Sequence, residues 1–333
     1  MVTVAKDSAR MTQTRLGAAM LALALLLPAS SAPALAEDAA KPSLPEPRDT
    51  AVRARERAAM IAFYDAMGGP DWIQRDFWGS DRPVGDWHGV TTDADGYVVT
   101  LTIYDNNVTG RLSPTICGLA RLQTLHLSFN NIFGTLPEEI GNCRALKNFW
   151  VKGNKITGRL PDSVAVLPEL DYLDIHANQM TGPLPTKWNT PKLTQFWGND
   201  NQISGPLPAA LMRQPLLEKL LLFNNRLSGP IPATLSPSLG LLLLANNSLS
   251  GPIPDAFGPL KKLTDLRLNR NQLTGPVPPS LAAAPALQVL RLDHNRLQGT
   301  IPNGLAGRLT VFDASDNPQL KPVRAAVPDT AHR

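Results

Sequence analysis

The residues of this sequence that could perform acid–base or metal chemistry are few and scattered. Five histidines are present, and Asp174 lies two residues before His176. Residues two apart on a strand point to one face, so this pair could orient an imidazole as a general base or a metal ligand. His126 is predicted on the same face, two repeat units away. No nucleophile elbow, phosphate-binding loop or zinc spacing accompanies them. The sequence therefore predicts a protein that is not an enzyme, with no catalytic residues, no cofactor and no metal site.

A short acidic run, Asp93-Ala94-Asp95-Gly96, is the other candidate for a metal. It resembles the start of a calcium-binding loop but lacks the remaining ligands. An Asp-Gly pair followed by Tyr97-Val98-Val99 is typical of a β-hairpin turn. A hairpin is therefore the preferred interpretation.

Binding chemistry is the stronger signal, because aromatic and charged residues recur at related positions. Aromatic rings come first along the chain and guanidinium and carboxylate groups later, residue types typical of binding hot spots. Trp150 and Trp197 hold equivalent positions two repeats apart, about 10 Å from each other, a gap that could hold a peptide side chain or a sugar. The predicted ligand-binding residues are Tyr104, His126, Phe129, Trp150, Tyr172, His176, Trp197, Phe223, Arg267, Arg291 and Asp293. The alternative is that strands favour aromatic residues and that neighbouring rings bury one another.

A repeating skeleton must position these residues. The stretch Leu122–Leu146 reads L-x-x-L-x-L-x-x-N-x-I-x-G-x-L-P at its start, and this skeleton returns every 22 to 24 residues. A fixed period in this range predicts a solenoid. The marker asparagines are Asn106, Asn130, Asn154, Asn178, Asn201, Asn225, Asn247, Asn271, Asn295 and Asn317.

Each part of the skeleton has a physical role. In L-x-L the two leucines point inward on a short strand, and the residues that flank them point to the concave face. The Asn side chain at the turn can satisfy backbone groups that the turn leaves unpaired. Stacked coils should therefore form a ladder of buried, hydrogen-bonded amides.

The two cysteines, Cys117 and Cys143, fall on the convex side of adjacent coils. Neighbouring strands are about 4.8 Å apart, and a disulfide requires Cα atoms about 4.4–6.8 Å apart. A disulfide between them is expected in an exported protein. The alternative is a buried thiol at Cys143, where most repeats have leucine.

The N-terminal part divides into four segments. Residues 1–36 resemble a secretory signal peptide, with cleavage after Ala36 and translation starting at Met1 or Met11. Residues 37–49 form a Pro-rich linker. Residues 50–97 are predicted to form an N-terminal cap with a helix near 49–67, which places Arg53, Glu56 and Arg57 toward solvent. Its three tryptophans, Trp72, Trp78 and Trp87, either cover the end of the solenoid or form an aromatic binding site.

About ten repeats follow over residues 98–320, and residues 321–333 are predicted to be a disordered tail. The apolar run Leu16–Leu27 is too short to span a membrane, and no other long apolar run exists, so no membrane insertion is expected. Without residues 1–36, which hold three basic and one acidic residue, the net charge falls from +4 to +2. The sequence therefore predicts no nucleic-acid partner.

The blocks MTGPLP (180–185), LSGPIP (227–232 and 249–254) and LQGTIP (297–302) resemble the plant-type leucine-rich repeat (LRR). The segment from Phe63 to Ile103 resembles the N-terminal cap of such proteins from secreted bacterial and plant sources. The resemblance covers about residues 50–320. It implies an α/β repeat solenoid with short parallel strands, 3₁₀ turns and a second short strand at the L/I-P segment. The cap departs from the plant pattern because Trp87-His88-Gly89-Val90 has no paired cysteines around it.

These observations predict a secreted or periplasmic recognition module that binds a protein or peptide on its concave face. A second hypothesis is a carbohydrate-binding or envelope-adhesion protein, or an inhibitor of a polysaccharide-degrading enzyme.

Overall fold

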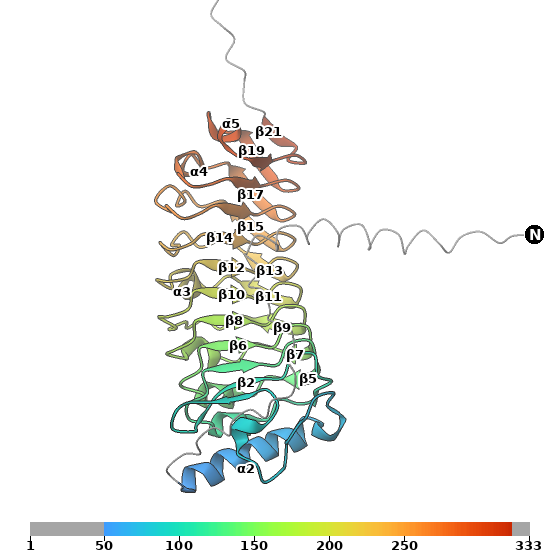
Figure 1. Ribbon diagram of the computed structural model, residues 1–333. Helices are drawn as coiled ribbons and strands as arrows, with labels where there is room; N and C mark the ends of the chain where they lie inside the picture. Colours follow the sequence, from blue (N-terminus) through green and yellow to red (C-terminus); the bar gives the residue numbers. More distant parts are fainter. Residues whose placement is uncertain (1–49, 322–333) are drawn as a thin grey trace, which may run out of the picture. The chain divides into compact units, whose positions relative to one another are not determined.

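The computed structural model describes residues 50–321. The predicted signal peptide, the linker and nearly all of the predicted tail lie outside this range. The described residues form a stack of coils closed at one end by a helix (Figure 1). No helix among them is long and apolar enough to cross a membrane.

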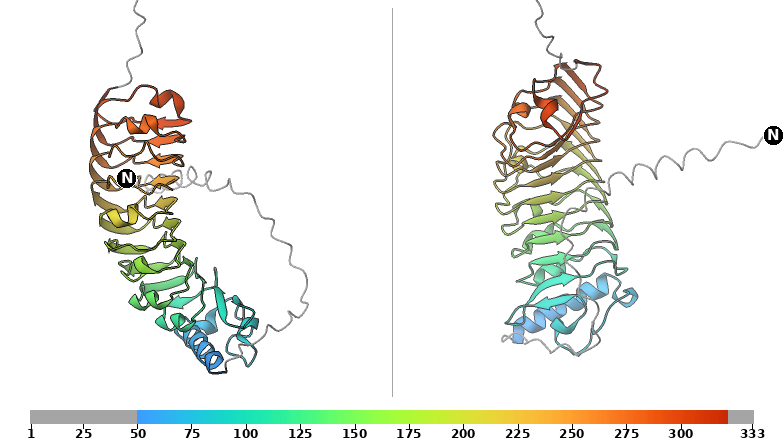
Figure 2. Two further views of the ribbon diagram at one scale, coloured as in Figure 1. Left: turned by 90° about the vertical axis from the view of Figure 1, so that its left-hand side faces the viewer. Right: turned by 45° about the horizontal axis from the view of Figure 1, so that its top comes forward.

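The first of two sheets has 11 strands and lies on the inner, concave side of the curved stack (Figure 2). All neighbours are parallel except the hairpin pair β1 and β2, which is antiparallel. Each coil contributes one short strand, so the sheet grows by one strand per repeat. The strands are β1 Val90–Thr92, β2 Val98–Thr102, β4 Thr124–His126, β6 Asn148–Trp150, β8 Tyr172–Asp174, β10 Gln195–Trp197, β12 Lys219–Leu221, β14 Leu241–Leu243, β16 Asp265–Arg267, β18 Val289–Arg291 and β20 Val311–Asp313.

The second sheet has ten strands, formed by the segments that follow the marker asparagines. This confirms the second strand that the plant-type repeat implies. Its strands are β3 Thr109–Gly110, β5 Asn131–Thr135, β7 Lys155–Gly158, β9 Gln179–Pro183, β11 Gln202–Pro206, β13 Arg226–Gly229, β15 Ser248–Pro252, β17 Gln272–Pro276, β19 Arg296–Thr300 and β21 Gln319–Lys321.

The asparagine ladder forms as the sequence predicts. Asn178 donates to the carbonyl oxygen of Val151 in the preceding coil (3.0 Å) and to that of Ile175 in its own coil (3.1 Å). Its side-chain oxygen accepts the N–H of Ile156 (3.0 Å). Equivalent bonds recur from Asn130 to Asn317. The ladder links successive coils with hydrogen bonds in the interior, where an unpaired backbone group is costly.

The glycine of each repeat has a left-handed backbone conformation. At Gly205 φ is 77°, and a Cβ atom there would lie 3.2 Å from Cβ of Pro183 in the preceding coil. Glycine adopts this conformation without steric cost, and its missing side chain leaves room for that proline. The Gly-Pro pattern therefore allows adjacent coils to pack closely in the second sheet.

The other side of the coils carries short helical turns. The 3₁₀ turns that the resemblance implies appear in the first three of these coils, but three later coils have single α-helical turns instead. Cys117 and Cys143 form a disulfide with a Cα–Cα distance of 4.6 Å, joining the first two of these turns. The turns are η4 Pro114–Gly118, η5 Glu138–Asn142, η6 Val164–Val166, α3 Ala209–Met212, α4 Ser280–Ala283 and α5 Leu305–Arg308.

The cap consists of helix α2 (Thr50–Ala66), two 3₁₀ turns, η2 (Gly69–Asp71) and η3 (Val84–Asp86), and the β1–β2 hairpin. Its three tryptophans are buried and pack on one another, with ring centroids 5.0 Å apart for both Trp72–Trp78 and Trp78–Trp87. They therefore cover the end of the repeat core, as the first of the two interpretations predicts, rather than forming an open binding site.

One residue of the cap helix is placed wrongly by the sequence analysis. Glu56 was expected in solvent, but its exposed fraction is 1%. Its Oε2 atom accepts the backbone N–H of Val98, the first residue of β2, at 3.0 Å. Burial raises the pKa of the Glu56 carboxyl, and the bond from Val98 opposes this effect. Glu56 thus joins the cap helix to the first repeat.

Candidate functional site

Five predicted residues form a continuous ladder of rings on the concave face, called here the aromatic ladder: Tyr104, His126, Trp150, Tyr172 and Trp197. The distances between successive ring centroids are 5.3, 4.9, 5.4 and 5.4 Å. Three of the four contacts are edge-to-face, a geometry that aromatic pairs prefer. Strands β4, β6, β8 and β10 each carry one of the last four rings, and Tyr104 lies two residues after the end of β2.

The space expected between the two tryptophans is occupied by another ring. Trp150, Asp174 and Trp197 are partners across β6, β8 and β10. The Tyr172 ring, from the same strand as Asp174, contacts both indoles edge to face. The space is therefore filled by Tyr172 and is not an open slot for a peptide side chain or a sugar. Sequence spacing could not reveal this, because it depends on the direction of the Tyr172 side chain.

The ladder is most open at its N-terminal end. Tyr104 is 50% exposed and Phe129, whose ring is 5.4 Å from it, is 44% exposed. The Lys152 ammonium lies 5.3 Å from the Phe129 ring centre, within cation–π range. Trp150, Tyr172 and Trp197 are half-buried by their neighbours. Lys152 is not among the predicted ligand-binding residues, although its position two residues before the marker Asn154 could have indicated it.

Asp174 and His176 form the best acid–base pair of the site. Asp174 is 2% exposed, and its Oδ1 atom lies 2.6 Å from Nδ1 of His176. Burial, and then the Asp174 charge, raise the pKa of the Tyr172 hydroxyl above its ordinary range. Within residues 50–321 no group of three or more potential ligands is placed to hold a metal ion. The pair orients an imidazole, but the sequence motifs supply no nucleophile for it to activate.

His126 has a different environment. Burial lowers its pKa, the Lys152 charge lowers it further, and Asp174 opposes both. The ring is therefore neutral at pH 7, like the rest of the aromatic ladder.

The C-terminal part of the predicted site is organised by ion pairs. Arg267 donates to both carboxylate oxygens of Asp265, at 3.0 and 2.9 Å. Arg291 is exposed and lies between Arg267 and Asp313 in the strand register. Asp293 was expected at the ligand surface, but it is 5% exposed and its Oδ2 atom pairs with His294 at 3.0 Å. Its side chain is therefore buried and does not form part of the exposed concave surface.

Phe223 lies beyond the ladder, beside an apolar stretch. The structure shows no aromatic contact between Phe223 and Trp197 in the part of the chain that it describes. Phe223 is half-buried, as are its neighbours on the concave face, Leu221, Leu241 and Leu243. The concave face therefore changes from aromatic to aliphatic to charged along the stack.

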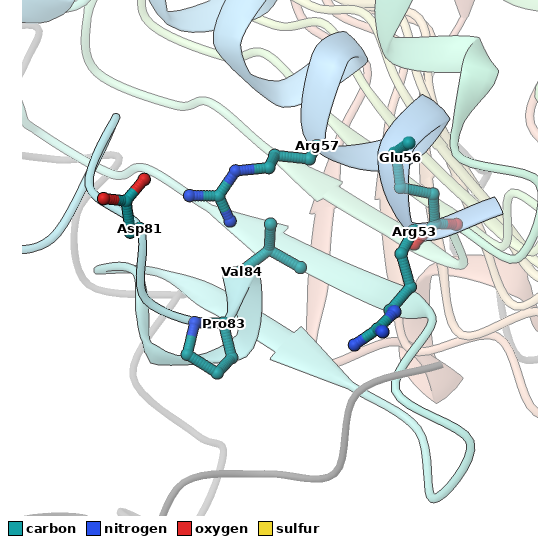
Figure 3. Close-up of a pocket in the computed structure, with 7 residues that line it drawn as sticks. Arg53, Glu56, Arg57, Asp81, Pro83 and Val84 are labelled. Atoms are coloured by element: carbon teal, nitrogen blue, oxygen red, sulfur yellow. The ribbon is translucent and has the colours of Figure 1, made fainter. Parts of the chain in front are cut away.

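The cap contains a cavity of about 340 Å³ between helix α2 and the loop at Asp81 (Figure 3). Arg57 in its wall donates to the backbone carbonyl oxygens of Arg82 (2.9 Å) and Ser80, and lies over the Trp87 ring. These contacts give Arg57 a structural role. The residues that line this cavity lie within positions 53–84 and are mostly charged, whereas the aromatic ladder spans positions 104–197.

The acidic run of the hairpin has a structural explanation as well. Nη1 of Arg121 lies 2.7 Å from Oδ2 of Asp93 and 3.0 Å from Oδ2 of Asp95. The other oxygen of Asp93 accepts the backbone N–H groups of Asp95 and Tyr97, both at 3.0 Å. Both carboxylates thus hold the turn together.

Comparison with protein families agrees with this geometry. Leucine-rich-repeat models match residues 121–143, 216–237 and 237–298. The fold is a leucine-rich-repeat solenoid. The expected strand ladder, 3₁₀ turns and helical cap are confirmed. No curated protein sequence matches the chain.

Three solved structures are informative about this LRR solenoid. The LRR ectodomain of the Arabidopsis thaliana receptor kinase GASSHO1/SCHENGEN3, in complex with CASPARIAN STRIP INTEGRITY FACTOR 2, is 31% identical over 80% of this chain, with a TM-score of 0.75. A plant peptide hormone receptor, RGFR1, in complex with RGF2, is 30% identical over 66%, with a TM-score of 0.56. A plant ice-binding protein is 25% identical over 82%, with a TM-score of 0.57.

The lengths of these proteins differ in an informative way. The chain spans 33% of the first ectodomain and 40% of the second, but 99% of the ice-binding protein. All three are plant proteins, so the expected likeness to secreted bacterial members stays a prediction.

Proposed function

We propose that this LRR protein is a non-enzymatic recognition module that binds an extended peptide or protein segment along its concave face. The observation that carries this proposal is the aromatic ladder, with exposed Tyr104 and Phe129 at its N-terminal end. The exposed Arg291 lies further along the same concave face, on β18. Aromatic and arginine side chains on one surface are characteristic of binding hot spots. The resemblance to two plant ectodomains solved with their ligands supports it.

A peptide fits this surface better than a glycan. The rings of the ladder meet mostly edge to face, so they present few parallel faces on which a sugar could stack. The change from aromatic to aliphatic to charged groups suits a segment with different side chains along its length. Carbohydrate binding, adhesion and inhibition of a polysaccharide-degrading enzyme remain the competing hypotheses.

We further propose that the protein acts outside the cytoplasm. Residues 1–36 have the pattern of an export signal, and the Cys117–Cys143 disulfide suits an oxidising compartment.

A random peptide display library, selected at pH 7, tests the proposed binding. We expect a family of enriched peptides whose binding is lost when Tyr104 and Phe129 are both replaced by alanine, and kept when Gln179, an exposed residue of the second sheet, is replaced. Enriched peptides that bind both variants equally would contradict the proposal. Binding to a glycan array in place of peptides would favour the carbohydrate hypothesis.

A second candidate function, ice binding, has one specific observation in its favour. The outward face of the second sheet carries small hydroxyl side chains in six consecutive coils, all at least partly exposed, in a row that runs obliquely across the strands. Ser204 pairs with Pro183 and Thr181 with Gln202, so successive hydroxyls are offset by two residues along the strands. One strand spacing and two residues of rise give the row a repeat of about 8 Å. The row consists of Thr157, Thr181, Ser204, Ser228, Ser250 and Thr274.

Inhibition of ice recrystallisation tests this candidate separately. We expect inhibition by the native protein and its loss when Thr181 and Ser204 are both replaced by lysine, which breaks the row with bulky charges. The Tyr104→Ala/Phe129→Ala variant is the matched control and should retain it. A native protein without inhibition would remove ice binding as a candidate and leave peptide recognition untouched.

A further inference from the structure

His126 connects the two halves of the aromatic ladder. Its ring lies 5.3 Å from that of Tyr104 on the open side and 4.9 Å from that of Trp150 on the half-buried side. Histidine is the side chain whose ordinary pKa places its change of charge between pH 5 and 8. A change of charge at this position therefore alters the surface that links the exposed rings to the tryptophans.

The groups that face His126 come from three coils. Tyr104 contacts it from the preceding coil, with Phe129 beside Tyr104. Trp150 and the Lys152 ammonium face it from the following coil, and the Asp174 carboxylate acts from the coil after that. Asp174 is already engaged, because its Oδ1 atom pairs with His176 at 2.6 Å.

We propose that protonation of His126 controls ligand binding at the aromatic ladder, so that the ladder binds apolar side chains at neutral pH and releases them near pH 5. This inference rests on the proposed function of the concave face and describes how ligand binding there is regulated. At pH 7 the ladder is uncharged. In mild acid an imidazolium appears in a half-buried position among aromatic rings and beside an ammonium group, where an apolar ligand would remove its water.

The size of the change in affinity follows from the thermodynamic coupling between ligand binding and protonation of His126. A ligand that covers the neutral ring lowers the pKa of His126 in the complex relative to the free protein. If covering the ring shifts the pKa by one unit, the affinity below both values is about tenfold weaker than at pH 7. A ligand with an acidic group at this position would show the opposite pH dependence.

The tryptophan fluorescence of the full chain tests the switch without any ligand. An imidazolium in contact with an indole quenches its emission, so acidification from pH 8 to 4.5 should quench Trp150 with a midpoint below the ordinary histidine value of 6.5. The substitution His126→Gln should remove this step, and Trp150→Phe should remove its amplitude. His176→Gln is the matched control, because His176 faces Trp197 instead, with ring centroids 6.1 Å apart. Persistence in His126→Gln of the Trp150-dependent step, the part that Trp150→Phe removes, would overturn the inference.

A second measurement connects the switch to binding. A peptide selected at pH 7 should bind the native protein several-fold more weakly at pH 5, and the His126→Gln variant equally at both pH values. Equal loss in both proteins would contradict the inference. Failure to select any peptide would count against the proposed function alone, because the fluorescence titration still decides whether His126 titrates against Trp150.

Discussion

Replacing Asn178 with alanine should destabilise the solenoid strongly, because one amide serves two coils. The side chain donates to the carbonyl oxygens of Val151 and Ile175 and accepts the N–H of Ile156, all within 3.1 Å. Asn178 is only 9% exposed, so water cannot readily replace these bonds. Each buried group left unpaired costs about 1–3 kcal/mol. For three such groups we expect a loss of about 3–9 kcal/mol in the free energy of unfolding.

Urea unfolding followed by circular dichroism measures this loss. The matched control is Gln179→Ala, an exposed replacement at the next residue, which should change stability by less than about 0.5 kcal/mol. Hydrogen exchange should show the largest loss of protection in the coils on either side of Asn178, since repeats depend on their neighbours. A loss below about 1 kcal/mol for Asn178→Ala would refute the structural role assigned to the asparagine ladder.

Three further predictions concern the disulfide, the second sheet and the cap. Replacing Cys117 and Cys143 together with serine should cost about 3–4 kcal/mol, given the closed loop, and should abolish the effect of reductant on urea unfolding; unchanged stability would contradict this. Gly205→Ala should cost about 1–2 kcal/mol because of its left-handed conformation, whereas Gly307→Ala, with open space around it, should cost nothing measurable; equal thermal shifts would be evidence against the packing role. The raised pKa of Glu56 means that the folded state holds this proton more tightly than the unfolded state, so the contribution of Glu56 to stability falls as pH rises from 4 to 7. Glu56→Gln, which mimics the protonated form, should therefore be at least as stable as the native protein at pH 7, and a clear loss of stability there in urea unfolding would show this sign to be wrong.

The fold was predictable because it depends on spacing alone. The recurring Leu-x-Leu and Asn positions determine which side chains are inward, and the marker asparagines form the expected bonds from Asn130 onward. The separation of Cys117 and Cys143 fits the joining of adjacent coils in the same way. Patterns of this kind require no knowledge of side-chain direction.

The details of the candidate site were less predictable for two physical reasons. Tyr172 fills the gap between the tryptophans, and Asp293 is buried, because each coil is covered by side chains of its neighbours. Glu56 is buried by a contact with Val98, 42 residues away in the sequence, which helix periodicity cannot show. For Tyr172 and Glu56, contacts with residues far away in the sequence decided the environment of a side chain whose position on its own strand or helix was clear.

Titration calorimetry with a peptide selected at pH 7 tests the central claim most directly. It compares the native protein with the Trp150→Ala/Trp197→Ala variant. Removing two hot-spot residues of about 2 kcal/mol each should weaken binding by at least about 100-fold, while the circular dichroism spectrum stays that of the folded solenoid. An affinity unchanged within about threefold in the folded variant would contradict the claim that the aromatic ladder is the binding surface.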